Sequence, residues 1–107
     1  MKPLFFANPA SFRRWLKKNH QTETELWVGF YKKGSGRPSI TWPEAVDEAL
    51  CFGWIDGVRK SLDEESYVNR FTPRRKGSNW SVVNLRRVEE LIRDGRMQPP
   101  GLRAYEA

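Results

Sequence analysis

Cysteine and histidine are nearly missing from this sequence of 107 residues, which holds one of each, Cys51 and His20. A single cysteine excludes an intramolecular disulfide, and the two residues together are too few for the usual zinc sites. Long apolar runs are also missing: Pro9 interrupts the N-terminal run, and no stretch approaches the roughly 18 apolar residues of a membrane span. These absences predict a protein of the reducing cytoplasm without a metal site, and no motif indicates a cofactor.

Positive charge and aromatic side chains are what the sequence has in quantity. Its 19 Lys and Arg against 13 Asp and Glu give a net charge of +6, and aromatic residues, five Trp among them, make up 13% of the chain. A chain of this length forms one domain, expected to span residues 1–107, and large rings supply much of its core. The charge favours anionic partners such as nucleic acid or phosphorylated metabolites, and a protein that is merely basic is the alternative.

Three segments carry helix-start signals followed by helical periodicity. The first, residues 9–19, starts with an Asn-Pro pair that suits the N-cap and the first helical position. The second follows a capping box made by Thr41 and Glu44. The third is predicted over residues 78–94, with Ser78 as its N-cap.

Three other segments have the alternation or the apolar content of strands: residues 25–32, 54–62 and 67–72. The first is apolar on both faces, which indicates a central strand or one partly covered on its second face. The other two form a hairpin in which Gly57 predicts a bulge or a close backbone approach. The order α-β-α-β-β-α predicts an α+β fold, with a small antiparallel or mixed sheet of about three strands packed against helices. A further element is expected to begin at Pro99.

The basic segment before the third predicted helix is the most informative stretch for function. Arg74, Arg75 and Lys76 precede the free backbone N–H groups and the positive dipole end of that helix. Arginine holds a phosphate through two hydrogen bonds, lysine acts as a point charge, and Trp80 could stack on a base. The segment therefore predicts binding of an anionic ligand or nucleic acid. The alternative is a solvated basic loop with Trp80 in the core.

Asp56 is the second candidate, because it lies in a predicted strand between two apolar residues. A half-buried carboxylate needs a partner, and Arg70 on the neighbouring strand is the expected one. A structural ion pair is the favoured interpretation, and a small enzyme with Asp56 and Arg74 in a polar cleft is the alternative. The candidate ligand-binding residues are Asp56, Arg70, Arg74, Arg75, Lys76, Ser78, Asn79, Trp80 and Asn84.

The two rare residues have structural interpretations. Cys51, near the end of the second predicted helix, is expected to be a small buried hydrophobe. His20 follows the basic first helix, where it is expected to interact with the negative end of the helix dipole. Neither is predicted to be catalytic, and no other residue is.

Several stretches are long and specific enough to resemble a known family. They are CFGWIDG at residues 51–57, FTPRRKGSNWS at 71–81 with Asn84, ELWVGF at 25–30, TWPEAVD at 41–47, and the segments around residues 91–97 and 101–102. Together they cover nearly the whole chain. On these motifs the sequence resembles the YdeI/OmpD-associated family, also labelled bacteriocin-protection proteins.

The resemblance implies a bacterial protein with a role in tolerance of bacteriocins or antimicrobial peptides, and it names no reaction. Members of that family usually continue past this point, so we expect that this chain lacks a C-terminal extension. Our hypothesis is a cytoplasmic binding or stress-tolerance module, not an enzyme, whose basic loop meets an anionic ligand or nucleic acid. A protein-interaction module linked to antimicrobial-peptide tolerance is the further alternative.

Overall fold

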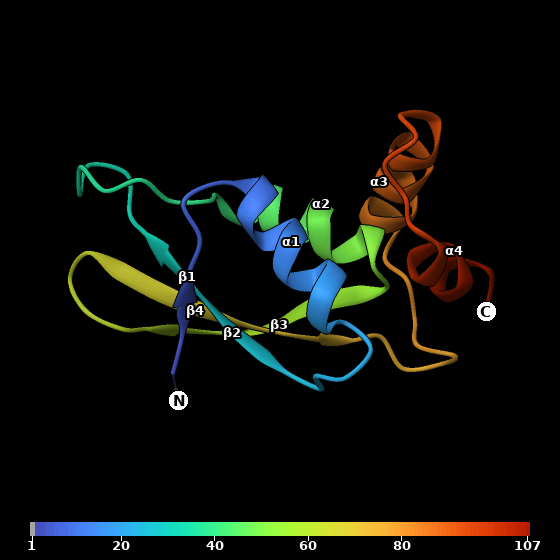
Figure 1. Cartoon of the computed structure of the whole chain (residues 1–107), viewed down its shortest axis with the longest axis horizontal. Coiled ribbons are helices and arrows are strands. Elements are labelled where there is room, and N and C mark those ends of the chain that lie inside the picture. The colour runs from blue at the N-terminus through green and yellow to red at the C-terminus, as the bar shows by residue number, and fades with distance from the viewer. Residues whose placement is uncertain (1) are drawn as a thin grey trace.

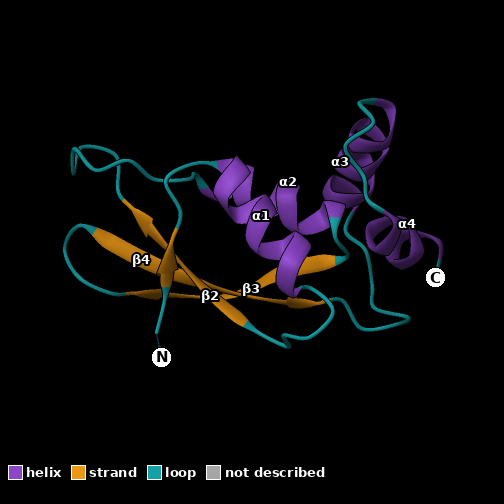
Figure 2. Cartoon of the chain, in the orientation of Figure 1, coloured by secondary structure: helices purple, strands orange, loops and turns teal. Residues whose placement is uncertain are grey.

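The structure is a computed structural model that describes residues 2–107, and a single sheet carries its helices on one face and at one end (Figure 1). In chain order the elements are β1 (Leu4–Phe5), α1 (Pro9–Asn19), β2 (Leu26–Tyr31), α2 (Trp42–Cys51), β3 (Trp54–Ser61), β4 (Ser66–Pro73), α3 (Val82–Arg93) and α4 (Pro99–Glu106). Figure 2 shows α1 and α2 above the sheet, with α3 and α4 grouped beyond its end. The predicted α+β class is confirmed, with one more strand and one more helix than the predicted order contains.

The sheet is mixed, with the strand order β1-β2-β4-β3. β1 runs parallel to β2, and the other neighbours are antiparallel. β2 therefore lies inside the sheet, as its two apolar faces predict. Leu26, Val28 and Phe30 are buried on the face that α1 and α2 cover. On the same face Phe12 of α1 packs edge-on against Phe71 of β4, with 5.6 Å between ring centroids.

The β3–β4 hairpin contains the irregularity that Gly57 predicts. The pairing register shifts between Asp56 and Arg59, which is the signature of a β-bulge. Beyond the bulge β3 is exposed along its length, and Val58 has 55% of its surface in solvent. Val58, two residues after Asp56, therefore does not share its half-buried environment.

Sequence periodicity could not reveal β1, because a strand of two residues has no pattern to read. Its position depends instead on a close approach. The Phe5 ring lies over the backbone of Gly29, where any Cβ would overlap it, and it stacks on Tyr31 with 4.6 Å between centroids. The glycine in β2 thus makes room for the ring that holds β1 to the sheet.

The first two helices begin where their N-cap signals predict. Asn8 accepts a hydrogen bond from the backbone N–H of Ser11, and Thr41 and Glu44 form a complete capping box. Gly53 follows α2 with a φ of +76°, the left-handed conformation that a helix end favours.

The third helix begins later than predicted. Ser81, and not Ser78, is its N-cap, with its hydroxyl accepting from the backbone N–H of Asn84, and α3 starts at Val82. Both serines have the same capping chemistry, so local sequence could not rank them. Val88 and Leu91 of this helix are buried, whereas Val83 in its first turn is 75% exposed.

The fourth helix docks by backbone contact against the end of α2. The backbone N–H of Gln98 donates to the Cys51 carbonyl oxygen at 3.0 Å. Gly101 is buried against the same carbonyl, at a position where a Cβ would overlap it. The helix begins at Pro99, where the sequence predicts that a further element starts. No helix within residues 2–107 has the length and apolar content to cross a membrane.

Ion pairs fix α2 to the elements that surround it. Glu48 is 4% exposed and binds two arginines, Arg13 of α1 at 3.0 Å and Arg96 of the α3–α4 connection at 2.6 Å. Asp47 accepts two hydrogen bonds from Arg87 of α3, at 2.7 and 2.8 Å. One helix thus holds three other segments through two carboxylates.

We expect Glu48→Ala to destabilise the fold by about 3 kcal/mol, because it leaves two arginines without their buried carboxylate. The value lies at the low end for a broken buried pair, since both arginines are partly exposed. Urea denaturation followed by tryptophan fluorescence measures it. The control Glu89→Ala, on the exposed face of α3, should change stability by at most about 0.5 kcal/mol. Equal effects of the two changes would contradict the role of Glu48.

We expect Gly101→Ala to destabilise the fold by about 1–2 kcal/mol, since the new methyl group would push α4 away from the Cys51 carbonyl and helix propensity offsets only part of this cost. Gly57→Ala is the matched control, because its Cβ would lie 3.5 Å from the nearest atom, an ordinary contact. Thermal unfolding of the two variants compares them, and a Gly101 variant as stable as wild type would disprove the tight docking of α4.

Candidate anion-binding cleft

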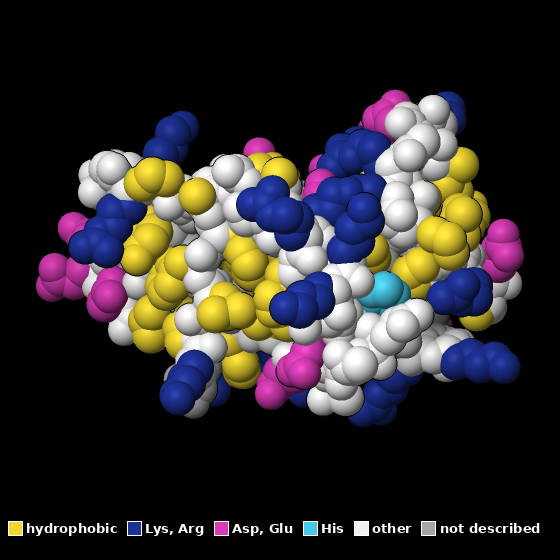
Figure 3. Space-filling view, viewed as in Figure 1, with side chains coloured by type: hydrophobic (Ala, Val, Ile, Leu, Met, Phe, Trp, Pro, Cys, Tyr) yellow, Lys and Arg dark blue, Asp and Glu magenta, His cyan; other side chains and the backbone are white. Residues whose placement is uncertain are grey.

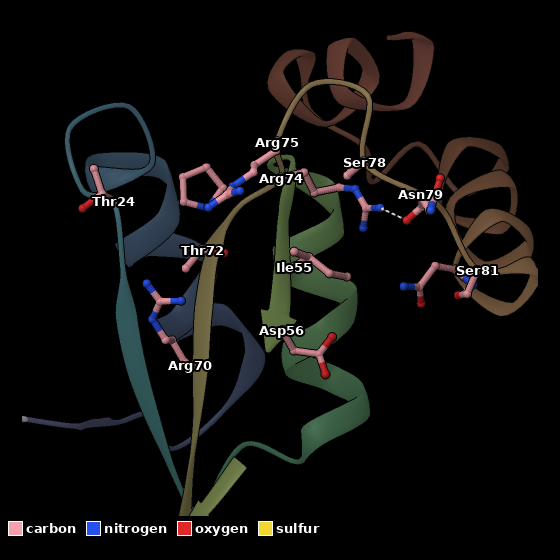
Figure 4. Close-up of a pocket in the computed structure, with 12 residues that line it drawn as sticks. Thr24, Ile55, Asp56, Arg70, Thr72, Arg74, Arg75, Ser78, Asn79 and Ser81 are labelled. Atoms are coloured by element: carbon pink, nitrogen blue, oxygen red, sulfur yellow. Dashed lines mark hydrogen bonds between the residues drawn. The ribbon is translucent and has the colours of Figure 1, made fainter. Parts of the chain in front are cut away.

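A cavity of about 700 Å³ lies between the end of the β3–β4 hairpin, the loop after β4 and the start of α3 (Figure 4). Seven of the nine predicted ligand-binding residues line it: Asp56, Arg70, Arg74, Arg75, Ser78, Asn79 and Asn84. Lys76 and Trp80 are not among the lining residues. The other lining residues are Thr24, Ile55, Thr72, Pro73 and Ser81.

Arg74 is the most constrained cation of the cleft. Its guanidinium carbon lies 3.7 Å from the centre of the Trp80 ring, and its Nη2 donates to the Asn79 carbonyl oxygen at 2.9 Å. Its Nε is buried and has no hydrogen-bond partner in residues 2–107. Burial lowers the pKa of the Arg74 guanidinium below its usual value. The side chain is thus held in place with part of its donor capacity unused.

Trp80 supports Arg74 instead of facing the cavity. Arg74 covers the face of the indole, and Tyr105 of α4 packs against it in a T-shaped arrangement, with 6.0 Å between centroids. The ring is half-buried against the core. Arg74 therefore occupies one face of the Trp80 ring, and a base could not stack on that face in this conformation.

Asp56 does not pair with Arg70, and that prediction is wrong. Asp56 lies opposite Phe71 in the sheet and Arg70 opposite Trp27, so the two side chains point to opposite faces. Arg70 instead pairs with Glu25. The carboxylate of Asp56 accepts a hydrogen bond from Nε1 of Trp42 at 3.2 Å. Figure 4 shows Arg70 and Asp56 on different sides of β4.

The start of α3 forms one wall of the cleft through Ser81 and Asn84. The cap uses the Ser81 hydroxyl and the Asn84 backbone, which leaves the Asn84 side-chain amide free for a ligand. Ser78 lies in the loop, where its backbone N–H donates to the Arg75 carbonyl oxygen at 3.0 Å. Arg74 and Arg75 of the basic loop thus line the same cavity as the start of α3, and Ser81 has the capping role that was assigned to Ser78.

A sequence family described as "Domain of unknown function (DUF8412)" matches residues 4–104. The chain belongs to the DUF8412 family. No curated protein and no solved structure matches it. The family description names no ligand, so the cleft itself carries the functional argument. The resemblance to YdeI/OmpD-associated proteins stays a prediction.

Positive charge on the DUF8412 domain is not confined to the cleft. Figure 3 shows Lys and Arg side chains across the visible face, several of them over α1 and α3. Arg14, Lys17 and Lys18 of α1 are all exposed. Any test of the cleft must therefore separate local binding from the general attraction of a basic protein for anions.

Cys51 is buried and His20 lies at the C-terminal end of α1 in this DUF8412 domain, as predicted. Cys51 is fully buried, and burial raises the pKa of its thiol to about 11. His20 caps α1, and its Nδ1 lies 2.7 Å from the Leu16 carbonyl oxygen. Within residues 2–107 no group of three or more His, Cys, Asp or Glu residues is arranged to hold a metal ion.

We expect the Cys51 thiol to resist modification by a thiol reagent at pH 8, because the reactive thiolate is scarce and the side chain is inaccessible. Unfolding in guanidinium should make the reaction rapid. The folded pKa lies above the unfolded value of about 8.5, so the unfolded chain loses its proton first and stability should fall as pH rises from there toward 11. Rapid modification of the folded protein at pH 8 would show that the thiol is not buried.

Proposed function

We propose that this domain binds a small anionic ligand in the cleft between the β3–β4 hairpin and α3. The observation that carries the proposal is Arg74, whose guanidinium is stacked on Trp80, hydrogen-bonded to a carbonyl oxygen, and paired with no carboxylate in the described residues. A positioned guanidinium with free donors suits the oxygens of a phosphate or carboxylate.

The remaining lining residues fit the same ligand class. Arg75 adds an exposed cation, and Arg70, whose charge is paired with Glu25, also lines the cavity. Hydroxyl and amide groups supply neutral hydrogen bonds from the side chains of Thr24, Thr72, Ser78, Asn79, Ser81 and Asn84. The volume of about 700 Å³ lies within the range of roughly 300–1,000 Å³ that is typical of small-molecule sites.

Nucleic acid is the alternative anion, and the net charge of +6 favours it. Two features of the cleft favour the small ligand. The face of Trp80 is already covered by Arg74, and Lys76, the third cation of the predicted basic loop, is not among the lining residues. Oligonucleotide binding would be recognised by a log affinity that falls linearly with log salt.

A small enzyme remains a second candidate, since Asp56 and Arg74 do line the same cleft. Arg74 would orient an anionic substrate, and Asp56 would act as a base. Turnover of a bound ligand that is lost in Asp56→Asn would support this reading.

The cellular setting belongs to the proposal too. A cytoplasmic location follows from the cysteine content, and a role in bacteriocin or antimicrobial-peptide tolerance from the resemblance to YdeI/OmpD-associated proteins. Binding of a protein partner is a further reading of that resemblance.

The test is titration with inorganic phosphate and pyrophosphate, followed by NMR chemical shifts. We expect shifts at Asn79, Ser81 and Asn84, and a loss of affinity of about tenfold or more when Arg74 and Arg75 are both replaced by Gln. The matched control replaces Arg14 and Lys17, which are exposed on α1, and changes the net charge equally. Unfolding midpoints confirm that each variant is folded.

If the two double variants lower the affinity for phosphate equally, the binding depends on the net charge of the protein and not on the cleft. Shifts confined to α1 would place the anion outside the cleft. Either result would refute the proposed function.

A further inference from the structure

The cleft contains two opposite charges, each without a charged partner. Elsewhere in residues 2–107 the buried Glu48 binds Arg13 and Arg96, and the half-buried Asp47 binds Arg87. The half-buried Glu44 has no ion pair, and its neutral partner is the Thr41 cap. Asp56 and Arg74 take part in no ion pair within the described chain. Partly buried charges without counter-charges are costly in a folded protein, and a ligand relieves that cost when it supplies the missing partner.

Each of the two charges is held by neutral groups. Trp42 donates its indole N–H to one carboxylate oxygen of Asp56, which leaves the other oxygen for a further donor. Arg74 rests on the Trp80 ring and donates to a carbonyl oxygen. Neutral partners fix the two side chains in position and leave their charges uncompensated.

An apolar side chain also lines the cavity. Arg74, Asp56 and Ile55 are all among its lining residues, and in the view of Figure 4 the Ile55 side chain is drawn between the Arg74 guanidinium and the Asp56 carboxylate. Ile55 is half-buried and lines the cavity. An aliphatic segment of a ligand would cover Ile55, while its two ends would reach the two charges.

The other arginines of the cleft are less suited to hold the anion. Arg70 is already paired with Glu25 and points to the opposite face of the sheet from Asp56. Arg75 is exposed. Arg74 is therefore the anchor for the anionic end.

We infer that the cleft selects a small zwitterion, with an anionic group for Arg74, an ammonium group for Asp56 and an aliphatic segment against Ile55. This inference rests on the proposed function, because it names the class of anion that the cleft takes. A phosphate that lacks the ammonium group would use only half of the site.

The experiment compares two series of probes that differ in one group. ω-Aminoalkyl phosphates with two to five carbons carry both charges, and the ω-hydroxyalkyl phosphates of the same lengths carry only the anion. We expect one chain length to bind about tenfold tighter as the amine than as the alcohol, measured by calorimetry at constant ionic strength. Asp56→Asn should remove this preference and leave the affinity for inorganic phosphate unchanged or higher.

Asp94→Asn is the control for the loss of one carboxylate. Asp94 caps the C-terminal end of α3, is exposed and is not among the residues of the cleft, so this variant should keep the preference for the amine. The Asn side chain at position 56 retains an oxygen that accepts from Trp42, which keeps the site assembled.

Three outcomes are distinguishable. If the wild-type protein binds the aminoalkyl and hydroxyalkyl phosphates with equal affinity, the inference of a zwitterionic ligand is overturned, and the proposed anion site is not affected. A preference that survives in Asp56→Asn would overturn the role of Asp56. Failure of every phosphate to bind, inorganic phosphate included, would refute the proposed function and the inference with it.

Discussion

The buried carboxylate of Glu48 is the contact on which the arrangement of the helices depends. It binds one arginine from α1 and another from the α3–α4 connection, and an uncompensated charge there would be costly. α2 is thereby fixed relative to α1, and its C-terminal end becomes an attachment point. Gln98 and Gly101 dock on the Cys51 carbonyl, and the backbone N–H of Arg74 donates to the Gly53 carbonyl at 2.9 Å. Arg74, which lines the cleft, is therefore attached through its backbone to the residue that follows α2, the helix that Glu48 holds in place.

Features decided within a few residues could be predicted from the sequence. The capping box at Thr41 and the N-cap at Asn8 need only local chemistry, and both are present. Ser78 and Ser81 compete for one cap with equal chemistry, and the choice between them depends on how α3 packs against α2. The pairing of Asp56 failed for a similar reason, since a bulge and the strand register decide which face a side chain takes.

The cleft could be predicted in part, because its basic loop and the helix start are continuous in sequence. Its other walls come from segments far apart in the chain: Thr24 before β2 and Ile55 in β3. Ile55 looks like any core residue in a strand, and Thr24 lies in a polar connection without a motif. Only the sheet order brings them together, and sequence periodicity does not contain that order.

The proposed function rests on a contrast between paired and unpaired charges. Several charges of this fold have a charged partner: Glu48 binds two arginines, Asp47 binds Arg87, and Arg70 pairs with Glu25. In the cleft the same chain keeps Arg74 and Asp56 apart and stabilises each with a tryptophan. Under the proposed function, these are the two charges that a ligand in the cleft would compensate, because neutral supports hold the side chains in place without neutralising them.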